Sequence, residues 1–290
     1  MAKFPLTVVH SRAELMRVLC NDYYTGQAIG LVPTMGALHN GHLSLIALSR
    51  EKARVTVASI FVNPTQFAPG EDFETYPRDE ASDLEKLEGA GCDIAYLPRP
   101  LDMYPEGSVT DVRVPGLSDK LDGIYRPHFF YGVTTVVARL FLHVRPDVAV
   151  FGEKDYQQLQ IIRRMVTDLG MAIEIVGGPT LRETDGLAHS SRNLYLSQDE
   201  RRRASALHHA LSIAKDSLES GHSDLDTVLE VARATILEAG FSSVDYVSAV
   251  DPATLEDLSK DKSRWPAEAR ILGAAWLGKT RLIDNLPLKF

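Results

Sequence analysis

The chain has 290 residues, 44% of them hydrophobic and 24% charged, with a formal net charge of −8. This length suits roughly two domains of about 150 residues each. The acidic balance argues against a nucleic-acid partner, because phosphate backbones are bound by basic faces. No stretch approaches the ~18 apolar residues of a membrane span, and the first residues lack the pattern of a secretion signal. We therefore expect a soluble, cytoplasmic protein with neither nucleic acid nor membrane as a partner.

The two cysteines, Cys20 and Cys92, lie far apart and form no C-x-x-C motif. This spacing indicates neither a disulfide framework nor a zinc cluster. Reduced thiols are the expectation, in agreement with a cytoplasmic location.

In chain order, the first 183 residues alternate between helix-like and strand-like segments. Helical periodicity is present in residues 12–20, 41–54, 79–90, 133–144 and 156–169. Short apolar runs typical of buried strands occur at residues 28–32, 55–62, 93–97, 148–151 and 173–176. Strands that alternate with helices predict an α/β fold with a Rossmann-like, doubly wound parallel sheet. In such sheets ligands bind at the carboxyl ends of the strands.

The pattern changes toward the C-terminus. Residues 197–220 and 225–240 have the periodicity of amphipathic helices, and residues 244–252, 269–278 and 280–286 resemble short strands. We predict two domains, a nucleotide- and substrate-binding domain over residues 1–183 and a smaller α+β domain over residues 184–290. The polar junction between them suggests that the second domain could act as a lid.

One motif near the C-terminus competes for a phosphate-binding role. Residues 273–280, GAAWLGKT, match the pattern G-x-x-x-x-G-K-[ST] of many ATPases. That loop works when a strand leads into glycines and a helix follows. Here AAWL and the residues after Thr280 both have strand character, so we predict a hairpin turn with Lys279 as a solvated turn residue.

Residues 33–42, PTMGALHNGH, connect a predicted strand to a predicted helix. Gly36 permits a close approach of the backbone, and the free amides at a helix start favour an anion. His39 and His42 are three residues apart, so they can share one face of the helix entrance. Two imidazoles beside a phosphate could stabilise charge that builds up during phosphoryl chemistry. The alternative is a helix terminus at which the histidines only cap or pack.

Five segments, taken together, resemble a known family. They are PTMGALHNGH, FVNPTQF, YPR, VRPDVAVFGEKDYQQLQIIRRMV and DGLAHSSRN, in this order. H-x-G-H after a strand is the signature of the nucleotidylyl-transfer superfamily, and the whole set closely resembles the pantothenate synthetases, the ligases of pantoate and beta-alanine. The resemblance implies that ATP activates the pantoate carboxylate as an acyl adenylate with release of pyrophosphate. The amine of beta-alanine then displaces AMP to give pantothenate.

The resemblance also implies which residues bind ATP. His42 corresponds to the proton donor to the departing pyrophosphate, His39 assists it, and Lys154 follows the β and γ phosphates as a compact cation. The implied set is Met35, Gly36, Ala37, Leu38, His39, Asn40, Gly41, His42, Gly152, Glu153, Lys154, Asp155, Leu181, His189, Ser190, Ser191 and Arg192. Taken alone, residues 152–155 could be a loop that caps a helix, and residues 190–192 a solvated polar loop.

For pantoate, the resemblance implies contacts from Gln66 and Gln158, with Asn63 and Tyr76 lining the same cleft. Amides can bond both hydroxyls and a carboxylate; buried amides satisfied by backbone are the alternative. ATP chemistry requires Mg²⁺, held mostly by phosphates. Asp83 is a candidate ligand, although a surface helix carboxylate is the simpler interpretation. Family members are commonly homodimers, which we expect here too.

Three positions depart from the family pattern. His189 precedes the serine pair where Met or Leu is usual, and Asn40 replaces Glu or Gln. His128 lies one place before the usual histidine, whose position Phe129 occupies. Two other hypotheses stay open: another member of the superfamily, a nucleotidylyltransferase or a relic of an aminoacyl-tRNA synthetase, and a nucleotide-binding protein without activity.

Overall fold

The computed structural model describes residues 5–221, 224–258 and 261–290. The chain divides into two compact units. The first contains the chain up to Asp119 together with Arg126–Glu153 and Gln158–Pro179, and the second contains Lys120–Tyr125, Lys154–Gln157 and the chain from Thr180 onwards. By their contacts, the two short segments 120–125 and 154–157 belong with the C-terminal unit.

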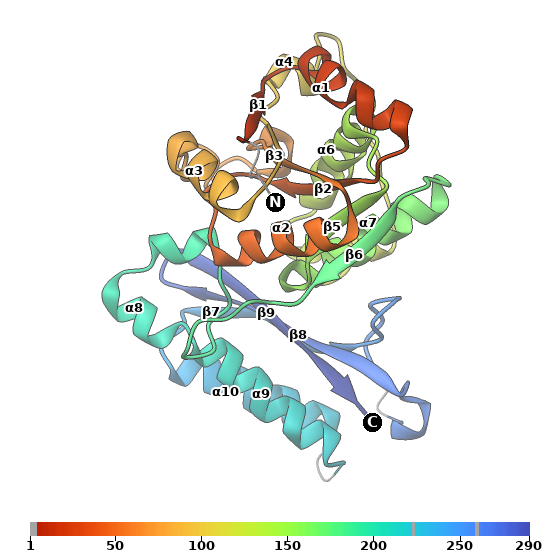
Figure 1. Cartoon of the computed structure of the whole chain (residues 1–290). Coiled ribbons are helices and arrows are strands. Elements are labelled where there is room, and N and C mark those ends of the chain that lie inside the picture. The colour runs from red at the N-terminus through yellow and green to blue at the C-terminus, as the bar shows by residue number, and fades with distance from the viewer. Residues whose placement is uncertain (1–4, 222–223, 259–260) are drawn as a thin grey trace. The chain divides into compact units, whose positions relative to one another are not determined.

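The first unit is built on a six-stranded parallel sheet (Figure 1). The strands are β1 (Thr7–Val9), β2 (Ile29–Thr34), β3 (Val55–Ile60), β4 (Ile94–Tyr96), β5 (Val148–Gly152) and β6 (Glu174–Gly178). Their spatial order is β1-β4-β3-β2-β5-β6. The direction of winding reverses between β2 and β5, which pair directly. Ligand crevices in doubly wound sheets form outside the carboxyl ends of the strands at such a switch point.

Helices cover both faces of this sheet, because successive strand residues point to opposite sides. Val32 and Ala58 belong to a core cluster with residues of α2 and α3, whereas Leu31 and Val57 belong to another with α1, α6 and α7. The helices of this part of the chain are α1 (Arg12–Thr25), α2 (Asn40–Lys52), α3 (Glu80–Ala90), α4 (Pro100–Met103), α6 (Phe129–Val144) and α7 (Tyr156–Asp168). Within the described ranges, every helix is too short or too polar to cross a membrane.

The predicted α/β class is confirmed, and each predicted strand and helix of the first unit has its counterpart. The sequence does not predict β1, because this strand has only three residues and two of them, Thr7 and Val8, are exposed. It joins the sheet at the edge by pairing with β4. Because β1 precedes the predicted strands, residues 152–155 lie at the end of the fifth strand in chain order, β5.

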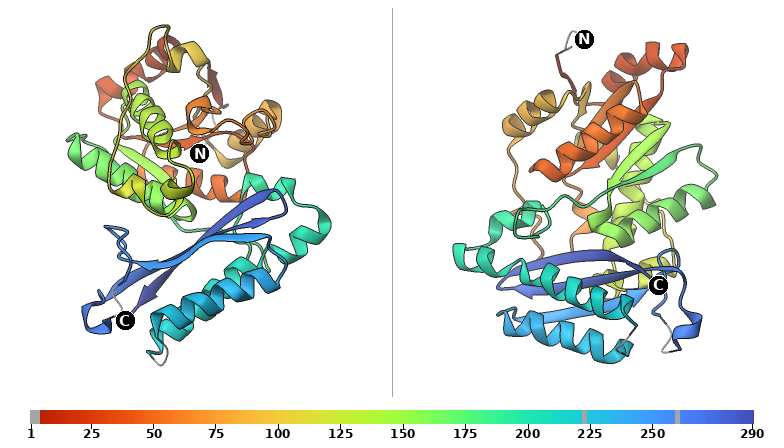
Figure 2. Two further views of the ribbon diagram at one scale, coloured as in Figure 1. Left: turned by 180° about the vertical axis from the view of Figure 1, so that it is seen from behind. Right: turned by 60° about the horizontal axis from the view of Figure 1, so that its bottom comes forward.

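The second unit is a small α+β structure, as predicted. Its antiparallel sheet has the order β7 (Ser243–Val250), β8 (Glu268–Leu277) and β9 (Thr280–Lys289). Figure 2 shows α9 and α10 side by side along this sheet, and their apolar residues share one core with its strands. The helices are α5 (Asp122–Tyr125), α8 (Gln198–Arg203), α9 (Ala206–Glu219) and α10 (Leu225–Glu238).

The GAAWLGKT motif forms strand and turn. Leu277 pairs with Thr280 across the two-residue turn between β8 and β9. Gly278 has φ of +58°, which suits a tight hairpin turn, and Lys279 is exposed. The predicted hairpin is confirmed, and because no helix follows the glycines, the motif lacks the geometry of a phosphate-binding loop.

Candidate active site

The loop between β2 and α2 starts at the carboxyl end of β2, beside the switch point. Thr34 Oγ1 donates to the Ser59 carbonyl at 2.7 Å and accepts the Gly36 amide at 3.2 Å, which ties the loop to β3. Gly36 has φ of +85°, and a Cβ at this position would lie 2.9 Å from Oδ2 of Asp83. Glycine is needed here for both its conformation and its size.

Asp83 of α3 holds this loop through two backbone amides. Its side chain is only 2% exposed, and its two oxygens accept the amides of Ala37 at 2.8 Å and Leu38 at 2.7 Å. Burial raises the pKa of the Asp83 carboxyl, and the two amide hydrogen bonds oppose that rise. The expectation of a surface carboxylate is wrong, because Asp83 lies one turn before Leu87 on the buried face of the helix.

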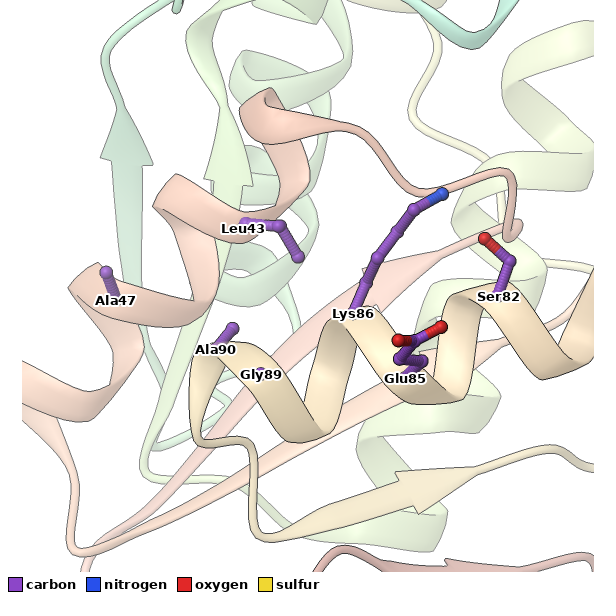
Figure 3. Close-up of a pocket in the computed structure, with 7 residues that line it drawn as sticks. All are labelled: Leu43, Ala47, Ser82, Glu85, Lys86, Gly89 and Ala90. Carbon is purple, nitrogen blue, oxygen red and sulfur yellow. The ribbon is translucent and has the colours of Figure 1, made fainter.

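Lys86 holds the same loop through a carbonyl. Its Nζ donates to the Leu38 carbonyl at 2.9 Å, and Figure 3 shows the side chain extended from α3 toward the loop. An open groove of about 630 Å³ beside it is lined by Leu43, Ala47, Ser82, Glu85, Lys86, Gly89 and Ala90. Because none of the predicted site residues lines this groove, it is distinct from the predicted nucleotide site.

The two histidines lie together at the start of α2. His39 is the N-cap, and the rings of His39 and His42 stack with centroids 4.0 Å apart. His42 Nδ1 accepts the His39 amide in a long, 3.4 Å hydrogen bond. In a neutral imidazole the proton then resides on Nε2, which leaves that nitrogen as a donor. Such a ring could donate to an oxyanion placed before the helix start.

Two predicted substrate residues, Asn63 and Gln66, contact each other after β3. Asn63 is 1% exposed and Gln66 7%, and Asn63 Nδ2 donates to Gln66 Oε1 at 3.2 Å. Gln66 Nε2 in turn contacts Met35 Sδ at 2.8 Å. The structure thus brings these amides next to the histidine loop. Asn63 Nδ2 also donates to the Gly132 carbonyl. Asn63 is therefore, at least in part, a buried amide satisfied by backbone, the alternative to a substrate contact.

Tyr104 is a residue of this cluster that the sequence does not single out. Its hydroxyl donates to Asn63 Oδ1 at 2.7 Å and lies 3.0 Å from Thr65 Oγ1. Burial raises the pKa of the phenol, so it is a neutral donor at physiological pH. Tyr76, the other residue predicted to line the cleft, is buried and packs edge-on against Phe67. No local motif marks Tyr104, because its partners lie about 40 residues earlier.

The two adjacent glutamines near the start of α7, Gln157 and Gln158, differ in their surroundings. Gln157 is 3% exposed; its amide accepts from the Asp122 backbone and donates to the Lys120 carbonyl. Gln158, the predicted pantoate contact, is half-buried and belongs to the first unit. Gln157 is therefore the structural residue of the pair, which leaves the substrate role to Gln158 as a prediction.

Gly152 ends β5 at the switch point, and Glu153–Asp155 form a short 3-10 turn before α7. Lys154 and Asp155 belong to the second unit, whereas Gly152 and Glu153 belong to the first. The Lys154 carbonyl accepts from Asn285 Nδ2 of β9 at 2.8 Å. A residue of the C-terminal sheet thus fixes the backbone of Lys154, the lysine predicted to contact the phosphates.

The remaining predicted nucleotide residues follow a small hairpin in the second unit. The His189 amide donates to the Leu181 carbonyl at 3.0 Å, which closes the hairpin. Ser190 then caps a 3-10 turn, Ser191–Tyr195, through its hydroxyl, which accepts the Arg192 amide at 3.3 Å. The structure presents Ser190, Ser191 and Arg192 in one compact turn; the triphosphate contact assigned to them stays a prediction.

Within the described ranges, no group of three or more His, Cys, Asp or Glu side chains could hold a metal ion. Asp83, the predicted Mg²⁺ candidate, uses both oxygens on backbone amides. The requirement for Mg²⁺ stays a prediction.

A doubly wound parallel sheet with an H-x-G-H loop at its switch point is the arrangement expected of an α/β protein of the nucleotidylyl-transfer superfamily. The family model described as Pantoate-beta-alanine ligase matches residues 7–287. The chain belongs to this family.

Relatives agree over almost the full length. The pantothenate synthetase of Hyphomonas neptunium is 61% identical over 283 residues, which cover 97% of this chain and 96% of the relative. The crystal structure of pantothenate synthetase from Thermus thermophilus has a TM-score of 0.90 at 46% identity, covering 97% and 98% of the two chains. Pantoate-beta-alanine ligase from Francisella tularensis, in complex with beta-gamma ATP and beta-alanine, has a TM-score of 0.80 at 32% identity and covers 97% of each chain.

Proposed function

We propose that this chain is an ATP-dependent ligase that joins pantoate to beta-alanine and forms pantothenate, AMP and pyrophosphate through a pantoyl adenylate. The observation that carries the proposal is the contact of Gln66 with Met35, which supports it because Gln66, a predicted pantoate ligand, then lies beside the loop of the two histidines. The family match over residues 7–287 and the Francisella tularensis complex support the same reaction. They favour it over another nucleotidylyltransferase of the superfamily.

In this proposal the carboxylate of pantoate attacks the α-phosphorus of ATP, and the bond from that phosphorus to the bridging oxygen of pyrophosphate breaks. A neutral His42 donates a hydrogen bond through Nε2–H to the oxygen of the departing pyrophosphate, and His39 supports the developing charge. Gln66 and Gln158 bind pantoate as neutral donors, while Asn63 and Tyr76 line the cleft; neutral donors leave the carboxylate more nucleophilic than a paired cation would.

Lys154, Ser190, Ser191 and Arg192 bind the β and γ phosphates in the proposal, and Mg²⁺ is held chiefly by phosphate oxygens. In the second step the amine of beta-alanine attacks the acyl carbon, and the bond from that carbon to the AMP oxygen breaks, so that AMP leaves. The cytoplasmic location and the homodimer expected from the sequence belong to the proposal as well.

The test is pantoate-dependent exchange of labelled pyrophosphate into ATP without beta-alanine. We expect the wild-type chain to catalyse it and the exchange rate of His42→Ala to fall about 10²- to 10³-fold, the range for removal of one hydrogen-bond donor to a developing oxyanion. Lys279→Ala serves as the control, because Lys279 is exposed in the β8–β9 turn. A chain in which Lys279→Ala abolishes exchange and His42→Ala does not would place the nucleotide at GAAWLGKT and refute the proposal.

A further inference from the structure

Two adjacent polar residues, Asp284 and Asn285, lie buried in the C-terminal strand β9. Their exposed fractions are 4% and 2%. Buried polar side chains in a small sheet are costly unless each finds its partners. Because neighbouring strand residues point to opposite faces, the two side chains can reach different segments of the chain. Asn285 contacts Lys154, and Asp284 contacts Arg182 in the hairpin that precedes Ser190–Arg192.

Asn285 fixes the backbone of the predicted phosphate-binding lysine. Its Nδ2 donates to the Lys154 carbonyl at 2.8 Å, and its Oδ1 accepts from Arg270 Nε at 2.7 Å. A guanidinium can only donate, so the Asn285 oxygen must face Arg270 and the amino group must face Lys154. Arg270 is itself held over the ring of Tyr156, 4.0 Å from its centroid. The amide therefore has one orientation.

Asp284 fixes the other segment through Arg182. The guanidinium of Arg182 binds both carboxylate oxygens, at 2.7 and 2.9 Å, and also donates to the Gly186 carbonyl at 3.0 Å. Arg182 thereby spans the hairpin whose last residue, His189, directly precedes Ser190–Arg192. Burial alone would raise the pKa of Asp284, but His208, whose Nδ1 lies 3.4 Å from Asp284 Oδ2, and the Arg182 guanidinium hold it below its ordinary value. The carboxylate is therefore charged at physiological pH.

We propose that Asp284 and Asn285 are positioning residues that set, from one strand, the placement of Lys154 and of Ser190–Arg192 for the triphosphate. They act through a carbonyl and through Arg182, not by contact with the nucleotide. The inference rests on the proposed function, since it takes these two segments to be the β- and γ-phosphate ligands.

The test compares ATP with AMP in Asn285→Ala and Asp284→Asn. Loss of one such hydrogen bond should raise the KM for ATP in pyrophosphate exchange about tenfold in each variant. Affinity for AMP should stay at the wild-type value, because AMP lacks the β and γ phosphates. Pantothenate formation from preformed pantoyl adenylate and beta-alanine should also be unchanged.

Tyr246→Phe provides the matched control. It removes a buried hydrogen bond from the same sheet, to Asp122 at 3.1 Å, with no contact to Lys154 or Arg182. Wild-type KM values for ATP in Asn285→Ala and Asp284→Asn would overturn the inference. Equal losses of ATP affinity, AMP affinity and pantothenate formation would also overturn it, because they indicate general unfolding. A wild-type chain without pantoate-dependent exchange would instead refute the proposed function.

Discussion

At the scale of single residues, Asp83 shapes the loop that carries both histidines. Hydrogen bonds to a charged acceptor contribute roughly 1.5–3 kcal/mol each, and Asp83 makes two with consecutive amides. Asp83→Asn keeps one acceptor but places an amino group against the second amide. We expect pantoate-dependent pyrophosphate exchange to fall about 10- to 100-fold, measured at saturating Mg²⁺.

Asp79→Ala is the control for Asp83, because it removes the N-cap of the same helix, where Asp79 Oδ1 accepts the Ser82 amide. This should cost about 1 kcal/mol of stability and leave exchange nearly intact. The half-saturating Mg²⁺ concentration should be the same in Asp83→Asn and the wild type. Activity of Asp83→Asn that returns at high Mg²⁺ would show instead that Asp83 is a metal ligand.

The residues that sequence could identify are those whose chemistry is local. H-x-G-H and the amides in NPTQF occur as short motifs, and the structure places Gln66 beside Met35. The role of Asp83 depends on a loop 45 residues earlier, which no local pattern reveals. Its burial, however, could have been inferred, because Asp83 precedes the apolar Leu87 by one helical turn.

At the scale of elements, α6 packs unusually closely against the turn that carries the substrate amides. An ideal Cβ at Gly132 would lie 2.5 Å from the Thr65 carbonyl oxygen and 2.7 Å from the Gln66 Cα. Gly132→Ala must therefore push α6 away from the turn Pro64–Gln66. We expect a loss of about 1–3 kcal/mol of stability in urea denaturation and a raised KM for pantoate.

Gly89→Ala is the matched control for Gly132→Ala. Gly89 also lies inside a helix, α3, but nothing lies within 4 Å of an added Cβ. Since alanine is the better helix former, this change should stabilise the protein by up to about 1 kcal/mol. Gly132→Ala with unchanged stability and unchanged KM for pantoate would show that α6 does not set the position of Gln66.

Helices and strands could be predicted from the sequence where the segment was long enough to show a clear apolar periodicity. Long helices such as α7 and buried strands such as β3 follow from their apolar patterns. The strand β1 does not, because two of its three residues are exposed and it is defined only by its pairing with β4. The same limit applies to residues 154–157, which join the second unit through partners such as Asn285 that lie far along the chain.

At the scale of the whole molecule, each unit has its own hydrophobic core, and we expect one buried histidine to make the core of the first unit sensitive to pH. His143 of α6 is 7% exposed, and its Nδ1 lies 2.9 Å from the Tyr96 hydroxyl. Burial raises the pKa of Tyr96 to about 12, so the phenol is neutral; it donates to Nδ1 in the tautomer with the proton on Nε2 and accepts in the other. Burial also lowers the pKa of His143 to about 4, helped by the charge of Arg12.

These shifts predict acid destabilisation of the first unit. Between about pH 6.5, the unfolded value, and about pH 4, the unfolded chain binds more protons at His143 than the folded chain, so stability falls as the pH falls. The slope approaches about 1.4 kcal/mol per pH unit. His143→Gln keeps an acceptor for Tyr96 but cannot titrate, and it should flatten the pH dependence of the urea midpoint in this window.

Two optical probes can assign this acid sensitivity to one unit. Both tryptophans, Trp265 and Trp276, lie in the second unit, so their emission reports that unit, whereas far-UV circular dichroism reports both. We expect the acid shift, and its loss in His143→Gln, to be larger by circular dichroism than by tryptophan emission. His209→Gln, at an exposed position of α9, should behave like the wild type. An identical pH slope in wild type and His143→Gln would mean that His143 does not control the acid stability of the first core.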